Sequence, residues 1–473
     1  MTKSVLVLLI FGLFLSFSAA HSEQTETTEF SGIYSDNKRV GFNKTTYTNN
    51  GNILTINEYS KLKMILLGAE SDMEITAKYI LNNGNLMNFE FKMNSVGLKL
   101  ETVGQRYGKK LKFQTSTVSG QSEFTQDIVN EPVVISYIYK WLVKQDLTAG
   151  KQYNLHIFEP SMLLMGSKLE DIKADIEIMG REKIDLSTGS YNAHKIKVNF
   201  NDSESNVWIS DKGELLRDQS SLGLVAIKEN EDLSGYQNLA RVDITEKTAI
   251  SASKTIDNPR KLDRLEVKIS GLSSLSDFNL NDNYRQFLKD DVLLIKTENI
   301  DLFKDLDSIP NKQSITEHYL KPTNLIQSDD ENIIHLSNNI VGKTKNPVDK
   351  IRLINSWVYN SLDKKPTISI PNALDVLRTK TGDCNEHSVL FAALSRAIDV
   401  PTKIILGIVY LDGKFYYHAW NEVFLGNWVS VDATLNQLPV DASHIKFLEG
   451  DISRSSEIMK LVGKLNLQII DAS

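Results

Sequence analysis

Residues 381–401 read TGDCNEHSVLFAALSRAIDVP, which is the pattern of a helix that begins at its cysteine. Asp383 suits the N-cap position, and Glu386 three residues later completes the pattern of a capping box. Apolar residues then recur at helical spacing: Leu390, Leu394, Ala397 and Ile398. Pro401 follows the expected end of the helix. The sequence therefore predicts that Cys384 is the first residue of a helix.

This position is typical of a nucleophilic cysteine. The first turn of a helix has unpaired backbone N–H groups and carries the positive end of the helix dipole. Both favour a thiolate, so we expect the pKa of the Cys384 thiol to be lowered. The alternative is a cysteine that only packs at the helix start as a small apolar side chain.

A histidine and an aspartate follow in residues 415–434, which read FYYHAWNEVFLGNWVSVDAT. The pattern predicts two strands joined by a turn at Gly426–Asn427, with His418 on the first strand and Asp432 on the second. A cysteine at a helix start, a histidine on a strand and an aspartate on the next strand are the parts of a thiol acyl-transfer triad. In such a triad the histidine accepts the thiol proton and later protonates the leaving amine, and the aspartate orients the imidazole.

An ideal short hairpin does not bring these two side chains together by itself. It places Asp432 opposite Asn421 or Glu422, three to four residues along the strand from the histidine. We therefore expect a β-bulge or a strong twist between the two strands.

Three motifs in this order resemble the transglutaminase-like superfamily in its bacterial exported form. They are GDCNEH at 382–387, YYHAWNEVFL at 416–425 and WVSVDAT at 428–434, with further similar segments at 373–377 and 439–445. The resemblance covers about residues 330–450 and implies a papain-like core, in which a cysteine-bearing helix packs against an antiparallel sheet. It implies Cys384 as the nucleophile, His418 as the base and Asp432 as its orienter. Arg378 stands where papain-type proteases have a glutamine, which departs from a direct protease pattern.

The resemblance implies reactions that pass through a thioester. They include protein cross-linking, amide or peptide hydrolysis and peptidoglycan-related chemistry. We expect acyl transfer from amide bonds of a peptide, protein or peptidoglycan-type cell-wall substrate, with no cofactor and no metal ion. Hydrolysis is favoured, because a cross-linking enzyme must shield its thioester from water and nothing in the sequence indicates how.

Two other functions stay open. One is a catalytically retired module that serves binding or assembly. The other is a metal site made of Cys384, His387, His418 and Asp432, whose ligand types suit zinc.

For four residues near the motifs, a structural role competes with a role in the site. We expect His387, one turn after the cysteine, to be a structural helix residue, and Trp420 and Trp428 to belong to the core. Glu422 either supports the site or is an exposed strand carboxylate.

The first half of the chain, from about Phe30 to Ile250, alternates between apolar and polar residues and predicts strands. Asn50-Gly51 and Asn83-Gly84 are typical of tight hairpin turns. One apolar helix is expected from Pro132 to about Lys144. No group of residues in this half suggests catalysis, and we expect structural roles for its isolated histidines, His156 and His194.

The overall expectation is an α+β chain, in which a mainly antiparallel β-domain precedes the transglutaminase-like core. The polar segment 257–261 separates the two halves. The predicted divisions follow the chain: a β-domain at 21–256, a linker or small β module at 262–325, the catalytic core at 330–450 and a C-terminal tail at 451–473.

Composition narrows the classes of function. The 473 residues contain 53 Lys and Arg, 60 Asp and Glu and a single cysteine. One cysteine excludes an internal disulfide and zinc sites built on several thiolates. The net charge of −7, without basic runs, excludes a nucleic-acid arm. The composition leaves the oligomeric state open.

The N-terminus has the pattern of a secretory signal peptide at residues 1–20. Lys3 precedes an apolar run at 5–15, and Ser18 and Ala20 are suited to cleavage after Ala20. We expect an exported protein, periplasmic or secreted, with no integral membrane segment after cleavage.

Overall fold

The computed structural model describes residues 24–66, 69–95, 98–117, 120–164, 167–200, 203–220, 223–231, 238–272, 274–282, 284–300, 317–365, 372–450, 458, 461 and 463–473. The expected signal peptide lies outside the described residues, as do parts of the segments 262–325 and 451–473. None of the helices that the structure describes combines the length and the apolar character that crossing a membrane requires.

The first half of the chain forms one large sheet. Its first run of strands is an antiparallel meander: β1 (Thr25–Ser35), β2 (Lys38–Asn50), β3 (Ile53–Leu66), β4 (Ala69–Asn82), β5 (Asn85–Ser95), β6 (Leu98–Tyr107), β7 (Lys110–Thr117) and β8 (Gly120–Asp127). The second run contains β9 (Val133–Val134), β10 (Gln152–Phe158), β11 (Lys173–Leu186), β12 (Gly189–Phe200), β13 (Ser203–Ile209), β14 (Leu215–Ser220) and β15 (Leu224–Lys228). β15 pairs with β1 and joins the two runs into one sheet.

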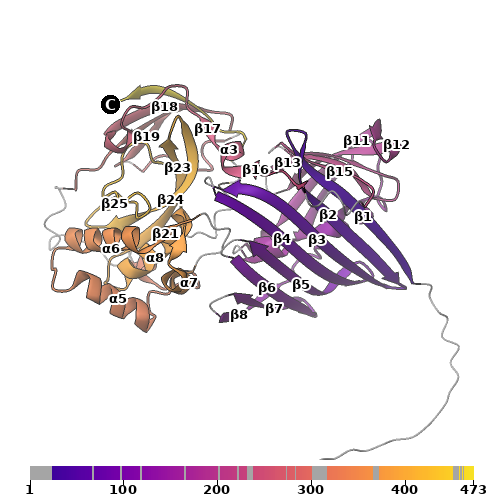
Figure 1. The fold of residues 1–473 in the computed structure, drawn as a ribbon, viewed down its shortest axis with the longest axis horizontal. Coiled ribbons are helices and arrows are strands. Elements are labelled where there is room, and N and C mark those ends of the chain that lie inside the picture. The colour runs from indigo at the N-terminus through magenta and orange to yellow at the C-terminus, as the bar shows by residue number, and fades with distance from the viewer. Residues whose placement is uncertain are drawn as a thin grey trace, which may run out of the picture.

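The two runs of strands face each other across a shared apolar core (Figure 1). The Phe89 ring on β5 meets the Phe158 ring on β10 edge-on, with ring centroids 4.8 Å apart. Gly104 on β6 makes room for this pair, because a Cβ atom there would lie 2.0 Å from the Phe89 ring. The predicted alternation therefore produces a rolled sheet with its apolar face inside.

The helix expected from Pro132 to Lys144 is shorter than predicted. Val133 and Val134 form β9, which pairs in parallel with β10, and the segment becomes helical only in η1 (Ile135–Tyr137) and α1 (Ile138–Leu142). β-branched residues favour strands, and here a pairing partner distant in sequence is available. Other short helices are α2 (Pro160–Leu164), η2 (Leu169–Asp171), η4 (Pro259–Lys261) and η7 (Glu317–Leu320).

A short segment connects the large sheet to the second half of the chain. β16 (Val242–Asp243) pairs with β3 of the large sheet. α3 (Ile244–Thr248) follows, and β17 (Ile250–Ser251) then pairs with a strand of the second half, β24 (Lys414–Phe424). Glu246 in α3 also binds the side chains of Lys414 and Tyr416 on β24.

The second half contains two sheets and a group of helices. One sheet has the order β19 (Gln286–Lys289), β20 (Val292–Lys296), β18 (Arg264–Ser270), β27 (Asn466–Ala472). The other has the order β17, β24, β23 (Thr402–Leu411), β26 (Ile445–Gly450), with β25 (Trp428–Val431) also on β24. The helices are α5 (Glu331–Val341), α6 (Pro347–Ser361), α7 (Ala373–Thr379) and α8 (Cys384–Arg396), and a two-stranded parallel pair joins β21 (Asp363–Lys364) to β22 (Thr381–Gly382).

One apolar core holds this half together, with buried members from Ile250 to Ile469. α8 lies at its centre, because α5, α6 and α7 contact it and its side chains from Glu386 to Arg396 are buried. The predicted fold class is confirmed: a strand-rich N-terminal domain precedes an α+β region in which the cysteine-bearing helix packs against an antiparallel sheet.

Candidate active site

The structure places Cys384 where the sequence predicts it, at the first residue of α8. Asp383 accepts a hydrogen bond from the backbone N–H of Asn385 at 3.0 Å, and Glu386 accepts one from the backbone N–H of Asp383 at 2.9 Å. These contacts form the predicted capping box. Gly382 lets the chain turn tightly here, because a Cβ atom at that residue would lie 2.2 Å from the Glu386 Cβ.

The Cys384 sulfur lies at an unpaired stretch of the edge of β24. β23 pairs with one edge of this strand along its length, whereas β17 and β25 cover only the two ends of the other edge. Between them, the strands that the structure describes leave residues 416–420 without a partner on that side. The backbone N–H of Ala419, which is next to His418 in the chain, lies close enough to the Cys384 sulfur to lower the pKa of the thiol.

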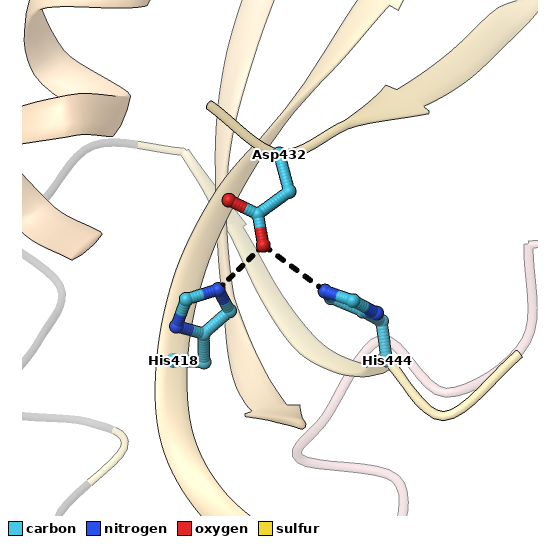
Figure 2. Close-up of side chains that lie close together, drawn as sticks. All are labelled: His418, Asp432 and His444. Atoms are coloured by element: carbon cyan, nitrogen blue, oxygen red, sulfur yellow. Dashed lines mark hydrogen bonds and ion pairs between the residues drawn. The ribbon is translucent and has the colours of Figure 1, made fainter. Parts of the chain in front are cut away.

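His418 and Asp432 are in direct contact. The His418 Nε2 atom lies 2.8 Å from Asp432 Oδ2, and Figure 2 shows the carboxylate directed toward the ring. The His418 side chain is 8% exposed and the Asp432 side chain is fully buried. The structure thus brings together the two residues that the sequence analysis assigned as base and orienter.

The expected β-bulge between β24 and β25 is absent from the register of these two described strands. Phe424 pairs with Trp428 and Asn421 with Val431, so the turn has three residues rather than two. This shifts the register by one residue, and Asp432 follows on the same side of the sheet as Trp420 and His418. Side chains on such a diagonal are within reach of one another, so the contact needs no bulge.

Asp432 is held at both of its oxygens. Oδ1 accepts the backbone N–H groups of Thr434 at 2.7 Å and Leu435 at 3.1 Å. Oδ2 contacts His418 and also His444, whose Nε2 atom is 3.2 Å away. Burial by itself would raise the pKa of Asp432, but the charge of His418 and hydrogen bonds from both imidazoles hold that pKa well below its usual range. The carboxylate therefore stays ionised.

His444 was not among the site residues predicted from the sequence. It belongs to the segment 439–445, which contributed only to the resemblance. The contact arises because β26 pairs with β23, which lies two strands away from β25, the strand that precedes Asp432. The periodicity of a single segment does not indicate which distant strand it pairs with. Its imidazole is fully buried, and its Nδ1 atom lies 3.4 Å from Asp441 Oδ1.

The pKa of the Cys384 thiol is raised, which contradicts the expected lowering. Burial of the sulfur is the main cause, and the carboxylates of Asp383, Glu386 and Asp432 add to it. The Ala419 N–H acts in the opposite direction. Desolvation and three nearby negative charges thus outweigh the effect of the helix start on the pKa of the thiol. The sequence predicted the position of the helix, but not the burial of the sulfur.

The neighbouring residues have the following contacts. His387 is buried, its Nδ1 atom lies 2.6 Å from the Asp383 carbonyl oxygen, and burial lowers its pKa. Trp420 is also buried, with its ring stacked on His418 and edge-on to His444. Trp428 is buried as well and lies under the Lys403 ammonium, 3.9 Å from the ring centroid.

The sequence left two possibilities for Glu422, and the structure rules out the exposed carboxylate. It is 1% exposed, and Lys446 Nζ lies 2.9 Å from its Oε1 atom. Tyr284 donates a hydrogen bond to its Oε2 atom at 2.9 Å. These buried contacts connect β24 to β26 on the face that carries His418.

Among the described residues, those close enough together to hold a metal ion are His418, Asp432 and His444. Cys384 and His387, which the alternative zinc site required, are not part of this group. In the N-terminal half, His194 lies 3.0 Å from Asp211, far in sequence from the other motifs.

Two family models match separate parts of the chain. Residues 334–433 match the transglutaminase-like superfamily, and residues 32–226 match a domain of unknown function, DUF6134. The resemblance predicted from the motifs is confirmed for residues 334–433. The match supports a papain-like thiol enzyme at the level of the superfamily. No curated protein matches the chain significantly.

Three solved structures are similar to parts of the chain. A protein from Cytophaga hutchinsonii proposed to be a cysteine protease is 20% identical, with 45% of this chain and 87% of that chain covered and a TM-score of 0.30. A β-barrel-like protein of the DUF1849 domain of unknown function, from Brucella abortus, is 10% identical, with 45% and 98% covered and a TM-score of 0.34. A protein from Parabacteroides distasonis proposed to be a protease is 11% identical, with 81% and 70% covered and a TM-score of 0.21.

Proposed function

Because residues 334–433 are a transglutaminase-like core, we propose that this protein is a thiol-dependent acyl-transfer enzyme that acts on amide bonds of a peptide, protein or cell-wall substrate. Cys384 is the nucleophile, His418 the general base and Asp432 its orienter. The observation that carries the proposal is the 2.8 Å contact between His418 and Asp432, next to the strand edge at which the Cys384 sulfur lies.

The proposed reaction uses both nitrogens of His418. Its Nε2–H donates to Asp432, which leaves Nδ1 to accept the proton of the Cys384 thiol. The sulfur attacks the amide carbonyl carbon, and the backbone N–H of Cys384 at the start of the helix stabilises the negative charge on the oxygen. His418 then protonates the leaving amine, the C–N bond breaks, and a thioester remains.

Water completes the cycle in the hydrolytic form of the reaction. His418 removes a proton from the water molecule, which attacks the thioester carbonyl. The C–S bond breaks, a carboxylic acid leaves, and the sulfur regains its proton. Because the thiol pKa is raised, we propose that the first proton transfer accompanies the attack on the substrate rather than preceding it.

We propose hydrolysis rather than cross-linking, and a site of action outside the cytoplasm that follows from the signal-peptide pattern at residues 1–20. A peptidoglycan-type substrate and a protein substrate share the amide bond that this chemistry requires.

A trapping experiment tests the proposal. The wild-type protein and the Cys384→Ala and Cys384→Ser variants are incubated with a set of synthetic acyl-peptide amides and with isolated muropeptides, and intact-protein mass spectrometry follows the adducts. We expect an acyl adduct on the wild-type protein, a slower ester on the serine variant, and no adduct on the alanine variant. Equal product formation by the wild-type and alanine proteins contradicts the proposed nucleophile. If none of the amides yields a product, the result favours the catalytically retired binding module.

A further inference from the structure

A cavity of about 210 Å³ lies inside the rolled N-terminal sheet, next to its apolar core. The residues described in its lining lie between Glu29 and Asp218, so all of them belong to the N-terminal half. Glu29, Thr45 and Glu58 are neighbours on β1, β2 and β3, because Glu29 pairs with Thr45 and Thr45 with Glu58. Residues of η1, α1 and β14 complete the described lining. The N-terminal domain thus builds this cavity without the transglutaminase-like region.

Three carboxyl groups line the cavity, and two of them lack a positive partner. Glu29 forms an ion pair with Lys140. No positively charged group of the described residues acts on Glu58 or Asp218. The Oδ1 atom of Asp218 is buried and has no hydrogen-bond partner in the described part of the chain. A buried carboxylate costs free energy when it lacks both a cation and a hydrogen-bond donor, so this cavity suits a ligand that supplies both.

The pKa values of the two carboxyl groups agree with this reading of the contacts. Burial raises the pKa of Glu58 to about 7, and the charge of Glu159 adds to the rise, although the hydroxyl groups of Ser136 and Thr45 act against it. Burial also raises the pKa of Asp218. A cation bound beside these groups would favour their ionised forms and lower both pKa values.

The rest of the lining suits a short alkyl chain. Ile135, Ile138 and Leu215 are apolar, and the Tyr139 side chain adds an aromatic ring. Because one water molecule takes up about 30 Å³ in the liquid, the cavity has room for about seven water molecules or for an organic ligand with a similar number of non-hydrogen atoms. The size and the apolar lining therefore indicate a small ligand with one polar end.

We propose that this cavity is a binding site for a small organic cation, whose ammonium or guanidinium group contacts Glu58 and Asp218 and whose alkyl chain lies against the apolar lining. Both head groups carry a positive charge and N–H donors, which are the two features that these carboxylates lack. A metal ion fits less well. Among the described residues, the group of three ligand atoms within 4.8 Å of one another is the one at Asp432, not the carboxylates of this cavity. The inference is independent of the reaction proposed for Cys384.

Saturation-transfer NMR titrations of the full-length protein test the ligand class. The probes are n-butylamine and n-butylguanidine, and each of two control compounds lacks one feature: n-butanol has no charge, and tetramethylammonium has no N–H group. Ligands this small bind at best with about micromolar affinity, so the titrations extend to about 10 mM. We expect at least one of the two probes to bind in this range, at least about tenfold more tightly than either control compound.

Two variants test the residues. Glu58→Gln and Asp218→Asn keep the shape of each side chain and remove its charge. Each should weaken binding by at least about tenfold, because a buried cation then loses a hydrogen-bonded charge partner. The matched control is Asp175→Asn, which removes the same charge from an exposed residue of β11 outside the described lining. This control and Cys384→Ala should both bind the probes with wild-type affinity.

Several outcomes would overturn the proposal. They are equal affinity for a probe and a control compound, no binding of either probe up to about 10 mM, and wild-type affinity in both cavity variants. Loss of binding in Cys384→Ala would move the cation to the candidate active site and overturn the cavity as well. If circular dichroism shows that one cavity variant does not fold, the other variant decides by the same criterion. Turnover of amides by a protein that binds no cation would leave the proposed reaction intact.

Discussion

Ile469 and Ile470 are adjacent residues of β27 with opposite exposure, 2% and 43%. Replacing an isoleucine by alanine removes three carbon atoms, which is worth about 2.4 kcal/mol of transfer free energy at full burial. Scaled by burial, the loss is about 2.4 kcal/mol for Ile469→Ala and about 1.4 kcal/mol for Ile470→Ala. Only Ile469→Ala also leaves a cavity, because a gap at the exposed site fills with water. We expect Ile469→Ala to lower the free energy of unfolding by about 1–3 kcal/mol more than Ile470→Ala.

Urea unfolding followed by tryptophan fluorescence measures this difference. Three of the five tryptophans lie in the C-terminal half and report its unfolding: Trp357, Trp420 and Trp428. With a slope of about 2 kcal/mol per molar urea, the two midpoints should differ by about 0.5–1.5 M. Equal midpoints would mean that residues 466–472 do not contribute to the core that surrounds the candidate site.

Four further results are expected. Cys384→Ala should abolish turnover and change the free energy of unfolding by only about 1 kcal/mol, because one sulfur atom contributes little buried area; kinetics and urea unfolding check both. Asp432→Asn should reduce kcat less than His418→Ala, since the histidine transfers the proton and the aspartate orients it; a slower Asp432→Asn enzyme contradicts the assigned roles. A fragment of residues 249–473 should fold alone and one of residues 330–450 should not, because the apolar core includes Ile250 and Ile469; circular dichroism of the two fragments decides. The folded-state pKa of Asp432 is depressed, so its contribution to stability is present at neutral pH and is lost as the pH falls below about 4; acid unfolding of Asp432→Asn should lack this component.

The parts of the site encoded in short stretches of sequence were predictable. The capping residues Asp383 and Glu386 are local signals, and they locate Cys384 at the start of α8. His418 and Asp432 lie on adjacent strands of one hairpin, so spacing and the resemblance sufficed to pair them. Their exact register was not predictable, because it depends on whether the turn has two residues or three.

The parts set by distant contacts were not predictable. His444 meets Asp432 through the pairing of β26 with β23, and β27 pairs with β18 about 200 residues earlier in the chain. The raised pKa of Cys384 depends on desolvation of the sulfur, which the whole fold determines. A local sequence pattern indicates on which helix or strand a residue lies. The charges and the burial around its side chain come from segments elsewhere in the chain, which the local pattern does not include.

The pairing of β17 with β24 has a consequence for self-association. Residues 250–251 cover the end of β24 that precedes His418, and without them Lys414 and Phe415 would present unpaired backbone groups at a sheet edge. Such an edge can pair with the same edge of a second molecule and produce a continuous intermolecular sheet. The connection between the two halves thus also covers two residues of a sheet edge that would otherwise be open to pairing with a second molecule.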